Sequence, residues 1–282
     1  MDERISVSKM SRRRFFKRSA KKMLFSDWIN HIFAFFIVGA VVTGIFQYGS
    51  NCMMLVDHLT GNDAFSGLII VAYILLSALV VIPLLYGLVV YETCAVENER
   101  GNITDVFSVF SSLSLIIRSY VLCLYLFFKT ILYFLPALFF LGLLFAEGEE
   151  TYSLGAYVWH DINFAYLMLE TLFFACLAVG AVLSSKHLVG VYLCVIRPDM
   201  KIRDAFFTAK ICCHGSRAEI ARLMISFIPL LWLSFYTAGL LFVLYSLPYM
   251  LITCVLQSKY LYEKEVRLKN VQKLLYETND EN

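Results

Sequence analysis

Two charged residues lie inside apolar segments of the chain. Lys129 interrupts the apolar residues 120–146, and Glu170 interrupts residues 162–184. A charge near the centre of a bilayer costs about 2.5–3.5 kcal/mol on insertion scales, so such a residue usually faces other helices and finds a partner. If the two segments are adjacent antiparallel helices, both charges lie at nearly the same depth, which predicts a buried ion pair that lines a polar cavity. In the alternative, Lys129 extends to the cytoplasmic surface and Glu170 is protonated.

Acidic and histidine side chains gather in two segments that we expect outside the membrane. Carboxylates and imidazoles are suitable ligands for a divalent cation. Loops on the outer side are also commonly poor in Lys and Arg, so a solvated acidic rim explains the same residues. We favour the rim, and no metal or cofactor is expected. The group comprises Asp57, His58, Asp63, Glu147, Glu149, Glu150, His160 and Asp161.

Motifs that would indicate an enzyme are absent from the sequence. It contains no Gly-x-x-x-x-Gly-Lys loop for phosphate, no His-Glu-x-x-His and no Gly-x-Ser-x-Gly. Its eight cysteines form no Cys-x-x-Cys pair, and most lie in or beside apolar runs, which is typical of buried thiols. A catalytic function is therefore not expected.

The composition is that of an integral membrane protein. Hydrophobic residues make up 60% of the chain and charged residues 16%, with a mean hydropathy of +0.70. Soluble domains are usually about 45–50% apolar and about 25% charged. A nucleic-acid partner is not expected from such a chain.

An internal repeat organises the sequence. The phrase Ile103-Thr104-Asp105-Val106-Phe107 recurs 99 residues later as Ile202-Arg203-Asp204-Ala205-Phe206, and Arg118 and Arg217 keep the same offset. A more basic segment near the N-terminus is a degenerate third copy. The repeat motif consists of Ile103, Asp105, Phe107, Arg118, Ile202, Asp204, Phe206 and Arg217.

Each copy of the repeat has the pattern of an amphipathic helix. Ile202, Ala205, Phe206 and Ala209 fall on one side of a 3.6-residue period, and charged residues take the other. Such helices lie flat at the membrane surface with the aromatic face down. We expect them at about residues 10–25, 104–117 and 200–214, with Thr104 as the N-cap of the second.

Six apolar segments are expected to cross the membrane, at about residues 28–48, 67–91, 120–146, 162–184, 220–236 and 239–258. The last two come from a run of 36 uncharged residues, 223–258. One helix of that length would measure about 54 Å, against a hydrocarbon core of about 30 Å, so the chain must fold back, at Thr237-Ala238-Gly239. Glu92, Glu97, Glu99 and Arg100 mark an exit into water. Residues 1–262 form one membrane domain, and residues 263–282 form a charged, solvated helical tail.

Four prolines lie within the expected spans: Pro83, Pro136, Pro229 and Pro248. A proline frees a carbonyl group and kinks its helix, which is tolerated where neighbours or water restore the hydrogen bond. Kinked helices that line a cavity are one interpretation. Ordinary shaping of the bundle is the other, and we favour it.

The distribution of charge sets the orientation. The two outer segments, 49–66 and 147–161, contain six acids and no Lys or Arg, while nine of the 24 basic residues lie in residues 1–22. The positive-inside rule places both termini in the cytoplasm. One amphipathic helix and two spans then repeat three times, which suggests a helical bundle with approximate three-fold arrangement. The basic N-terminus either attracts anionic lipid headgroups or simply sets the orientation.

A resemblance to one family concerns residues 67–262. At Asp204-Ala205-Phe206, Gly215-Ser216-Arg217, Ser226-Phe227-Ile228, Leu247-Pro248-Tyr249 and Tyr260-Leu261-Tyr262 the chain resembles bacterial membrane proteins classed as domain of unknown function nine-seven-five. That family is distantly similar to the membrane domain of some glycerophosphodiester phosphodiesterases. The resemblance implies a multi-pass protein of the bacterial plasma membrane. It brings no catalytic residues.

These patterns favour a non-catalytic, all-α membrane module that interacts with lipids or with a partner protein the sequence does not identify. The alternative is a transporter of small solutes or lipids, which the repeats, the prolines and the charges Lys129 and Glu170 would suit. A transporter should contain a polar path at mid-membrane, whereas a module should have a packed apolar centre. A membrane enzyme is the third possibility.

Overall fold

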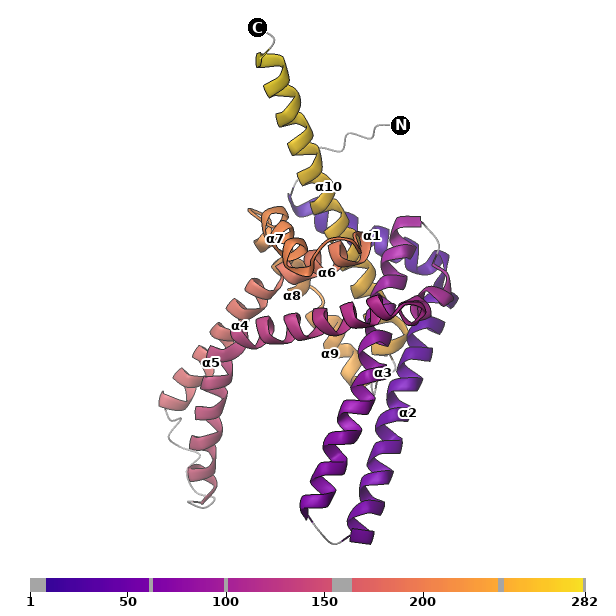
Figure 1. Cartoon of the computed structure of the whole chain (residues 1–282). Coiled ribbons are helices and arrows are strands. Elements are labelled where there is room, and N and C mark those ends of the chain that lie inside the picture. Colours follow the sequence, from indigo (N-terminus) through magenta and orange to yellow (C-terminus); the bar gives the residue numbers. More distant parts are fainter. Residues whose placement is uncertain (1–8, 61–62, 99–100, 154–163, 238–240, 281–282) are drawn as a thin grey trace.

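The computed structural model describes residues 9–60, 63–98, 101–153, 164–237 and 241–280, and all regular structure within them is helical (Figure 1). The prediction of an all-α fold is confirmed. The helices are α1 Lys9–Ser26, α2 Trp28–Thr60, α3 Asp63–Asn98, η1 Ile103–Ser111, α4 Leu113–Ser153, α5 Phe164–Ser184, α6 Lys186–Ile196, α7 Ile202–Cys212, α8 Arg217–Ile225, α9 Ile228–Tyr236, η2 Phe242–Ser246 and α10 Leu247–Asp280.

Among the described residues, three helices are long and apolar enough to cross a membrane. Their candidate spans are Trp28–Asn51 in α2, Gly67–Asn98 in α3 and Leu113–Leu144 in α4. The first two contain the expected segments 28–48 and 67–91, and the third covers the expected segment 120–146 up to Leu144. α2 lies beside α3 and α4 beside α5. Figure 1 shows both pairs extending to the same side of the molecule, away from α1 and α7.

The pairs of long helices expose their apolar side chains. Phe36, Phe46, Leu75, Phe128 and Phe139 are all more than half exposed. A helix that is apolar on every side requires an apolar surrounding. The exposed surfaces of α2, α3 and α4 therefore have the character of lipid-facing surfaces.

The buried core lies at the opposite end, where α1, α6, α7, α8 and α10 meet. Leu24, Leu193, Ile220, Phe227 and Ile252 are buried to 1% exposure or less and belong to one hydrophobic cluster. Buried thiols were expected, and four of the described cysteines, Cys194, Cys212, Cys213 and Cys254, are buried and free, whereas Cys94, Cys123 and Cys176 are only partly buried.

The fifth expected span, residues 220–236, is not one continuous helix. α8 ends at Ile225 and α9 begins at Ile228. Pro229 has no N–H group to donate to the Ile225 carbonyl, so a continuous helix would lose that hydrogen bond and clash with the proline ring. Instead the Phe227 N–H donates to the Met224 carbonyl, which closes a tight turn. Pro229 thus starts a helix and does not kink one.

The sixth expected span is continuous with the charged tail. α10 runs from Leu247 to Asp280 without a break, so the tail is an extension of the span and not a separate short helix. Pro248 is the second residue of α10 and follows a π-helical turn, in which the Leu247 N–H donates to the Phe242 carbonyl. The expected hairpin turn at 238–239 lies outside the described residues. Only Pro83 and Pro136 lie inside long helices, α3 and α4.

Two of the three expected amphipathic helices have the expected bounds. α1 and α7 match segments 10–25 and 200–214 to within two residues at each end. The second segment differs, because η1 is a 3₁₀ helix that ends at Ser111, and residues 113–117 already belong to α4. Its N-cap is Asn102 and not Thr104: the Asn102 side chain accepts from the Thr104 N–H, and Asp105 completes a capping box.

Each amphipathic segment packs against the last helix of another repeat unit. η1 packs on α3, α7 packs on α6, and α1 packs on α10 at the other end of the chain. The first two contacts require glycine. A Cβ atom at Gly87 would overlap the Val106 carbonyl oxygen, and one at Gly190 would meet the Phe206 ring. On the α10 side, the rings of Phe16 and Tyr260 lie 5.5 Å apart.

Candidate functional site

A cavity of about 530 Å³ lies among α3, α4, α6, α8 and α10. Small-molecule sites usually measure about 300–1,000 Å³ and are mostly apolar, with a few convergent polar groups. Apolar side chains such as Val89, Leu126, Phe134, Val191 and Leu251 form most of this lining. The lining residues come from widely separated parts of the chain, so the cavity exists only in the folded protein.

Two polar side chains in the cavity wall have no hydrogen-bond partner in the part of the chain that the structure describes. They are Thr93, through its Oγ1 atom, and His187, through both ring nitrogens. Thr93 is 1% exposed and His187 is 7% exposed, so bulk water does not satisfy them. A buried polar group without a partner costs about 1–3 kcal/mol, and such groups call for an explanation such as an unseen water or ligand.

Aromatic contacts hold His187 in place at the cavity wall. Its ring stacks on Tyr133 at 5.6 Å between centroids and meets the edge of Phe206 at 5.4 Å. Burial, and then the positive charges of Lys186 and Lys129, lower the pKa of His187 to about 4. The imidazole is therefore neutral at neutral pH, with one nitrogen that donates and one that accepts.

Positive charge lies near the cavity, and the described lining residues include no acid. The Lys186 Nζ atom lies 4.9 Å from the centre of the Tyr133 ring, and the Lys129 Nζ atom lies 5.9 Å from that of Tyr125. Neither lysine forms an ion pair within the described residues, and no Asp or Glu is among the described lining residues. Glu97 is already bonded to Tyr192 at 2.8 Å and to Lys259 at 3.0 Å.

The structure does not pair Lys129 with Glu170. No ion pair joins them among the described residues, and Glu170 is exposed on α5. Gly180 of α5 lies opposite Tyr133 and Phe134 of α4. In this register Glu170 is about 15 Å along α5 from that level, and Lys129 about 6 Å away in the opposite direction. The predicted ion pair assumed that each charge lies at a membrane depth counted from the expected first residue of its span. The observed register of α4 against α5 places the two charges at different levels.

A different buried pair links α2 to α3. The Nδ1 atom of His31 lies 3.0 Å from the Oε1 atom of Glu92, with side-chain exposures of 4% and 0%. Glu92 was expected at an exit into water, and this prediction was wrong, because its side chain is fully buried. The signal that could have found the pair was His31, an ionisable residue near the start of an apolar span. Thr93 and His187 were also missed, because neither residue is unusual in its sequence context.

The repeat motif residues do not come together in one site. Asp105 and Asp204 both lie in the first turn of their helices, and the residues that follow, Val106 and Ala205, are both fully buried. The pattern then differs, because Phe107 is 43% exposed and Phe206 only 6%. Of the other four members, Ile103 and Ile202 begin η1 and α7, Arg217 begins α8, and Arg118 lies in α4.

Arg118 binds the backbone at the end of α6. Its Nη2 atom donates to the carbonyls of Cys194 and Arg197, each at 3.2 Å, and of Met200 at 2.9 Å. Its Nη1 atom donates to the carbonyl of Pro198. The last carbonyls of a helix have no partners within it, and a cation is favoured there. Arg118 therefore joins α4 to the connection between α6 and α7.

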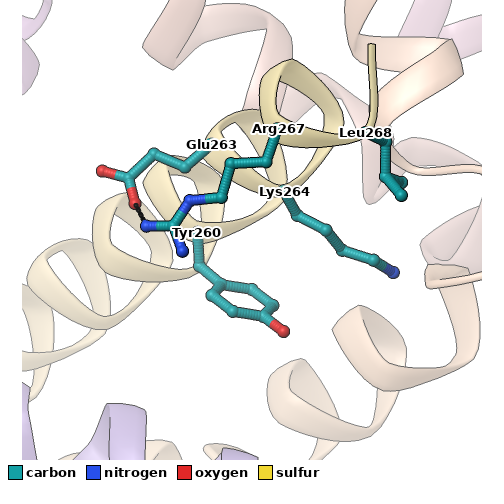
Figure 2. Close-up of a pocket in the computed structure, with 5 residues that line it drawn as sticks. All are labelled: Tyr260, Glu263, Lys264, Arg267 and Leu268. Carbon is teal, nitrogen blue, oxygen red and sulfur yellow. Dashed lines mark ion pairs between the residues drawn. The ribbon is translucent and has the colours of Figure 1, made fainter. Parts of the chain in front are cut away.

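A smaller hollow of about 260 Å³ lies on α10. Figure 2 shows the five side chains that line it: Tyr260, Glu263, Lys264, Arg267 and Leu268. Glu263 and Arg267 form an ion pair at 3.7 Å one helical turn apart, with exposures of 45% and 81%. An exposed pair of this kind contributes little to stability, and we assign no function to this hollow.

No group of three or more His, Cys, Asp or Glu residues that could hold a metal ion is present in the part of the chain that the structure describes. The proposed acidic rim is untested: residues 160 and 161 lie outside the described residues, and the side chains of the other members are not described.

No known protein was found to be similar to this chain. No protein-family model matches the chain, and no similar chain was found among curated proteins or solved structures. The resemblance to domain of unknown function nine-seven-five therefore stays a prediction.

Proposed function

We propose that the chain is a non-catalytic, multi-pass membrane module that binds lipids at the cytoplasmic leaflet. The observation that carries this proposal is the exposed surface of α1. Arg13, Arg14 and Arg18 are exposed on it together with Phe15 at 52% and Phe25 at 55%. Cations combined with aromatic rings suit the headgroup region of an anionic membrane.

The opposite surface of α1 is packed against the protein. Phe16, Ala20 and Leu24 are buried. Lys17 also belongs to this contact, because its Nζ atom donates to the Ser226 carbonyl at 3.2 Å and lies 4.8 Å from the centre of the Phe227 ring. Burial, and then the charge of Arg13, lower the pKa of Lys17. Only the exposed basic residues are therefore available to lipid.

The proposed topology has six spans, three repeated units and both termini in the cytoplasm of a bacterium. The contacts of the amphipathic segments support it. η1 of the second unit packs on α3 of the first, α7 of the third packs on α6 of the second, and α1 of the first packs on α10 of the third, which closes a cycle. Such a cycle is what three units arranged about a common axis would produce. The charge distribution supports the same orientation.

Topology is tested by cysteine labelling in intact cells. Single cysteines at Asn62 and Ser153 are expected to react with an impermeant maleimide from outside, and a cysteine at Lys264 only after the membrane is permeabilised. The background is a chain with its eight natural cysteines replaced by Ala or Ser. Reaction of Asn62 or Ser153 variants from the cytoplasmic side alone would contradict the six-span arrangement.

Lipid binding is tested by replacing Arg13, Arg14 and Arg18 together with Gln. Each basic residue near an anionic surface contributes about 1 kcal/mol, so the triple change should weaken phosphatidylglycerol binding about a hundredfold. Native mass spectrometry of the full chain, titrated with phosphatidylglycerol, measures this. Phosphatidylcholine binding should not change.

The control for the α1 change is a variant with Lys264 and Arg267 replaced by Gln, which removes exposed charge from α10. It should retain phosphatidylglycerol binding. If the two variants lose equal affinity, the effect is one of total charge, and α1 is not the lipid-binding surface.

A transporter is the second candidate, and the cavity among α3, α4, α6, α8 and α10 favours it. Its two unpartnered polar side chains, Thr93 and His187, supply some of the polarity that a path for a solute would need. Uptake or efflux by reconstituted vesicles would distinguish a transporter from a module.

A further inference from the structure

We propose that the cavity among α3, α4, α6, α8 and α10 binds an amphiphile with one apolar chain and one anionic headgroup. This inference relies on the membrane location in the proposed function but not on lipid binding by α1. The anionic group could be a carboxylate, as in a free fatty acid, or a phosphate, as in a lysophospholipid.

The lining defines the apolar part of the ligand. Most of the wall is aliphatic or aromatic, and Leu126, Val191 and Leu251 reach it from three helices. An apolar chain removed from water gains about 25 cal/mol for each Å² buried. The cavity volume of about 530 Å³ lies in the lower half of the range for small-molecule sites, which fits one chain better than a lipid with two.

The unpartnered groups define the polar part. The Thr93 hydroxyl and one nitrogen of the neutral His187 ring can each donate a hydrogen bond into the cavity. A ligand oxygen would satisfy groups that have no partner among the described residues. An apolar ligand alone would leave both groups unsatisfied, which costs free energy.

The lysines define the sign of the headgroup. Lys186 directly precedes the lining residue His187, and its Nζ atom lies 4.9 Å from the centre of the Tyr133 ring that stacks on His187. Lys129 directly precedes the lining residue Thr130 on α4. No described lining residue is acidic, and two carboxylates of α3 near the wall already have partners: Glu97 is bonded to Tyr192 and Lys259, and Glu92 to His31. Positive charge without a matching acid favours an anion over a neutral or cationic headgroup.

The experiment titrates the purified full chain with three probes and counts bound molecules by native mass spectrometry. The probes are oleate, oleoyl lysophosphatidate and the neutral mono-oleoylglycerol. We expect one oleate or one lysophosphatidate per chain and weaker binding of the neutral probe. Preference between the two anions identifies the headgroup. Equal binding of all three probes would overturn the assignment of an anionic ligand.

Two variants locate the site. Val191→Phe places a ring in the cavity and should weaken binding of the preferred anion about tenfold, because the added volume occupies the space of the chain. Lys129→Gln combined with Lys186→Gln should weaken binding of the anion about tenfold or more and leave the neutral probe unchanged.

Matched controls keep the two variants interpretable. Leu132→Phe adds a ring on the exposed side of α4, and Lys201→Gln removes an exposed charge; neither should change binding. The lysine variant alters partly exposed side chains and should fold even if Val191→Phe does not, which a thermal unfolding curve of each protein checks. If neither cavity variant weakens anion binding relative to its control, the cavity is not the site.

Binding of the anionic amphiphile in the cavity and binding of phosphatidylglycerol at α1 are tested independently. The variant with three arginines of α1 replaced should keep its affinity for oleate, and Val191→Phe should keep its affinity for phosphatidylglycerol. Loss of oleate binding in the α1 variant would place the oleate at the protein surface and overturn the cavity site.

Discussion

A chain in which Arg118 is replaced by Met is expected to lose about 3 kcal/mol of folding stability, because hydrogen bonds from a charged donor contribute about 1.5–3 kcal/mol and a cation at a helix C-terminus adds to this. Arg118 donates to four carbonyl groups in residues 194–200, from the last turn of α6 into the connection that precedes α7. Met has a similar length and no donor. The carbonyls would be left to water or without a partner.

The measurement is the free energy of unfolding in mixed micelles, with hydrogen exchange of residues 194–201 as a local readout. Faster exchange in that segment would show that Arg118 acts on the α6–α7 connection. Arg118→Lys should recover only part of the loss, since one ammonium group cannot reach four carbonyls in the way a planar guanidinium does. Arg203→Met, at an exposed position of α7, is the matched control and should change stability by less than about 0.5 kcal/mol. Equal losses at Arg118 and Arg203 would contradict this role.

Replacing His31 by Leu is expected to destabilise the packing of α2 against α3 by about 1–3 kcal/mol, the usual cost of leaving a buried hydrogen-bonding group without its partner. Glu92 is 0% exposed, and its Oε2 atom already has no partner. Without His31 its Oε1 atom would lose a hydrogen bond of 3.0 Å as well. A carboxyl group would then be buried with neither oxygen satisfied.

A double-mutant cycle separates the interaction from the effect of each side chain. Glu92→Leu removes the buried carboxyl group, and the double variant His31→Leu, Glu92→Leu should recover most of the stability lost by His31→Leu alone. Glu97→Gln is the comparison in an exposed pair, whose contribution is about 0.2–1 kcal/mol, because Glu97 is 33% exposed and Lys259 is 28% exposed. Losses that simply add in the double variant would show that His31 and Glu92 do not stabilise each other.

The positions of the helices follow from the sequence to a large extent. Long apolar runs require helices, because a backbone without water must bond to itself, and this predicts α2, α3 and α4. The periodic spacing of apolar and charged residues predicts α1 and α7 closely. Both patterns are local, so residues near one another in the chain carry enough information.

Proline shows where local information ends. All four prolines were expected within membrane spans. Pro83 and Pro136 do lie inside long helices, whereas Pro229 and Pro248 are each the second residue of a helix. The outcome depends on whether the preceding residues can take another hydrogen-bonding pattern. The tight turn at Phe227 and the π-helical turn at Phe242–Ser246 provide such patterns.

The candidate site was decided by tertiary structure alone. The register of α4 against α5 separates Lys129 from Glu170, and close packing at Gly180 against Tyr133 and Phe134 sets that register. The cavity joins Thr93 to His187 across 94 positions of the sequence, and each residue alone looks like an ordinary member of its helix. Composition and periodicity determine which segments become helices, because those are properties of one segment. Which side chains meet, and which polar atoms are left without a partner, depends on contacts between helices that no single segment encodes.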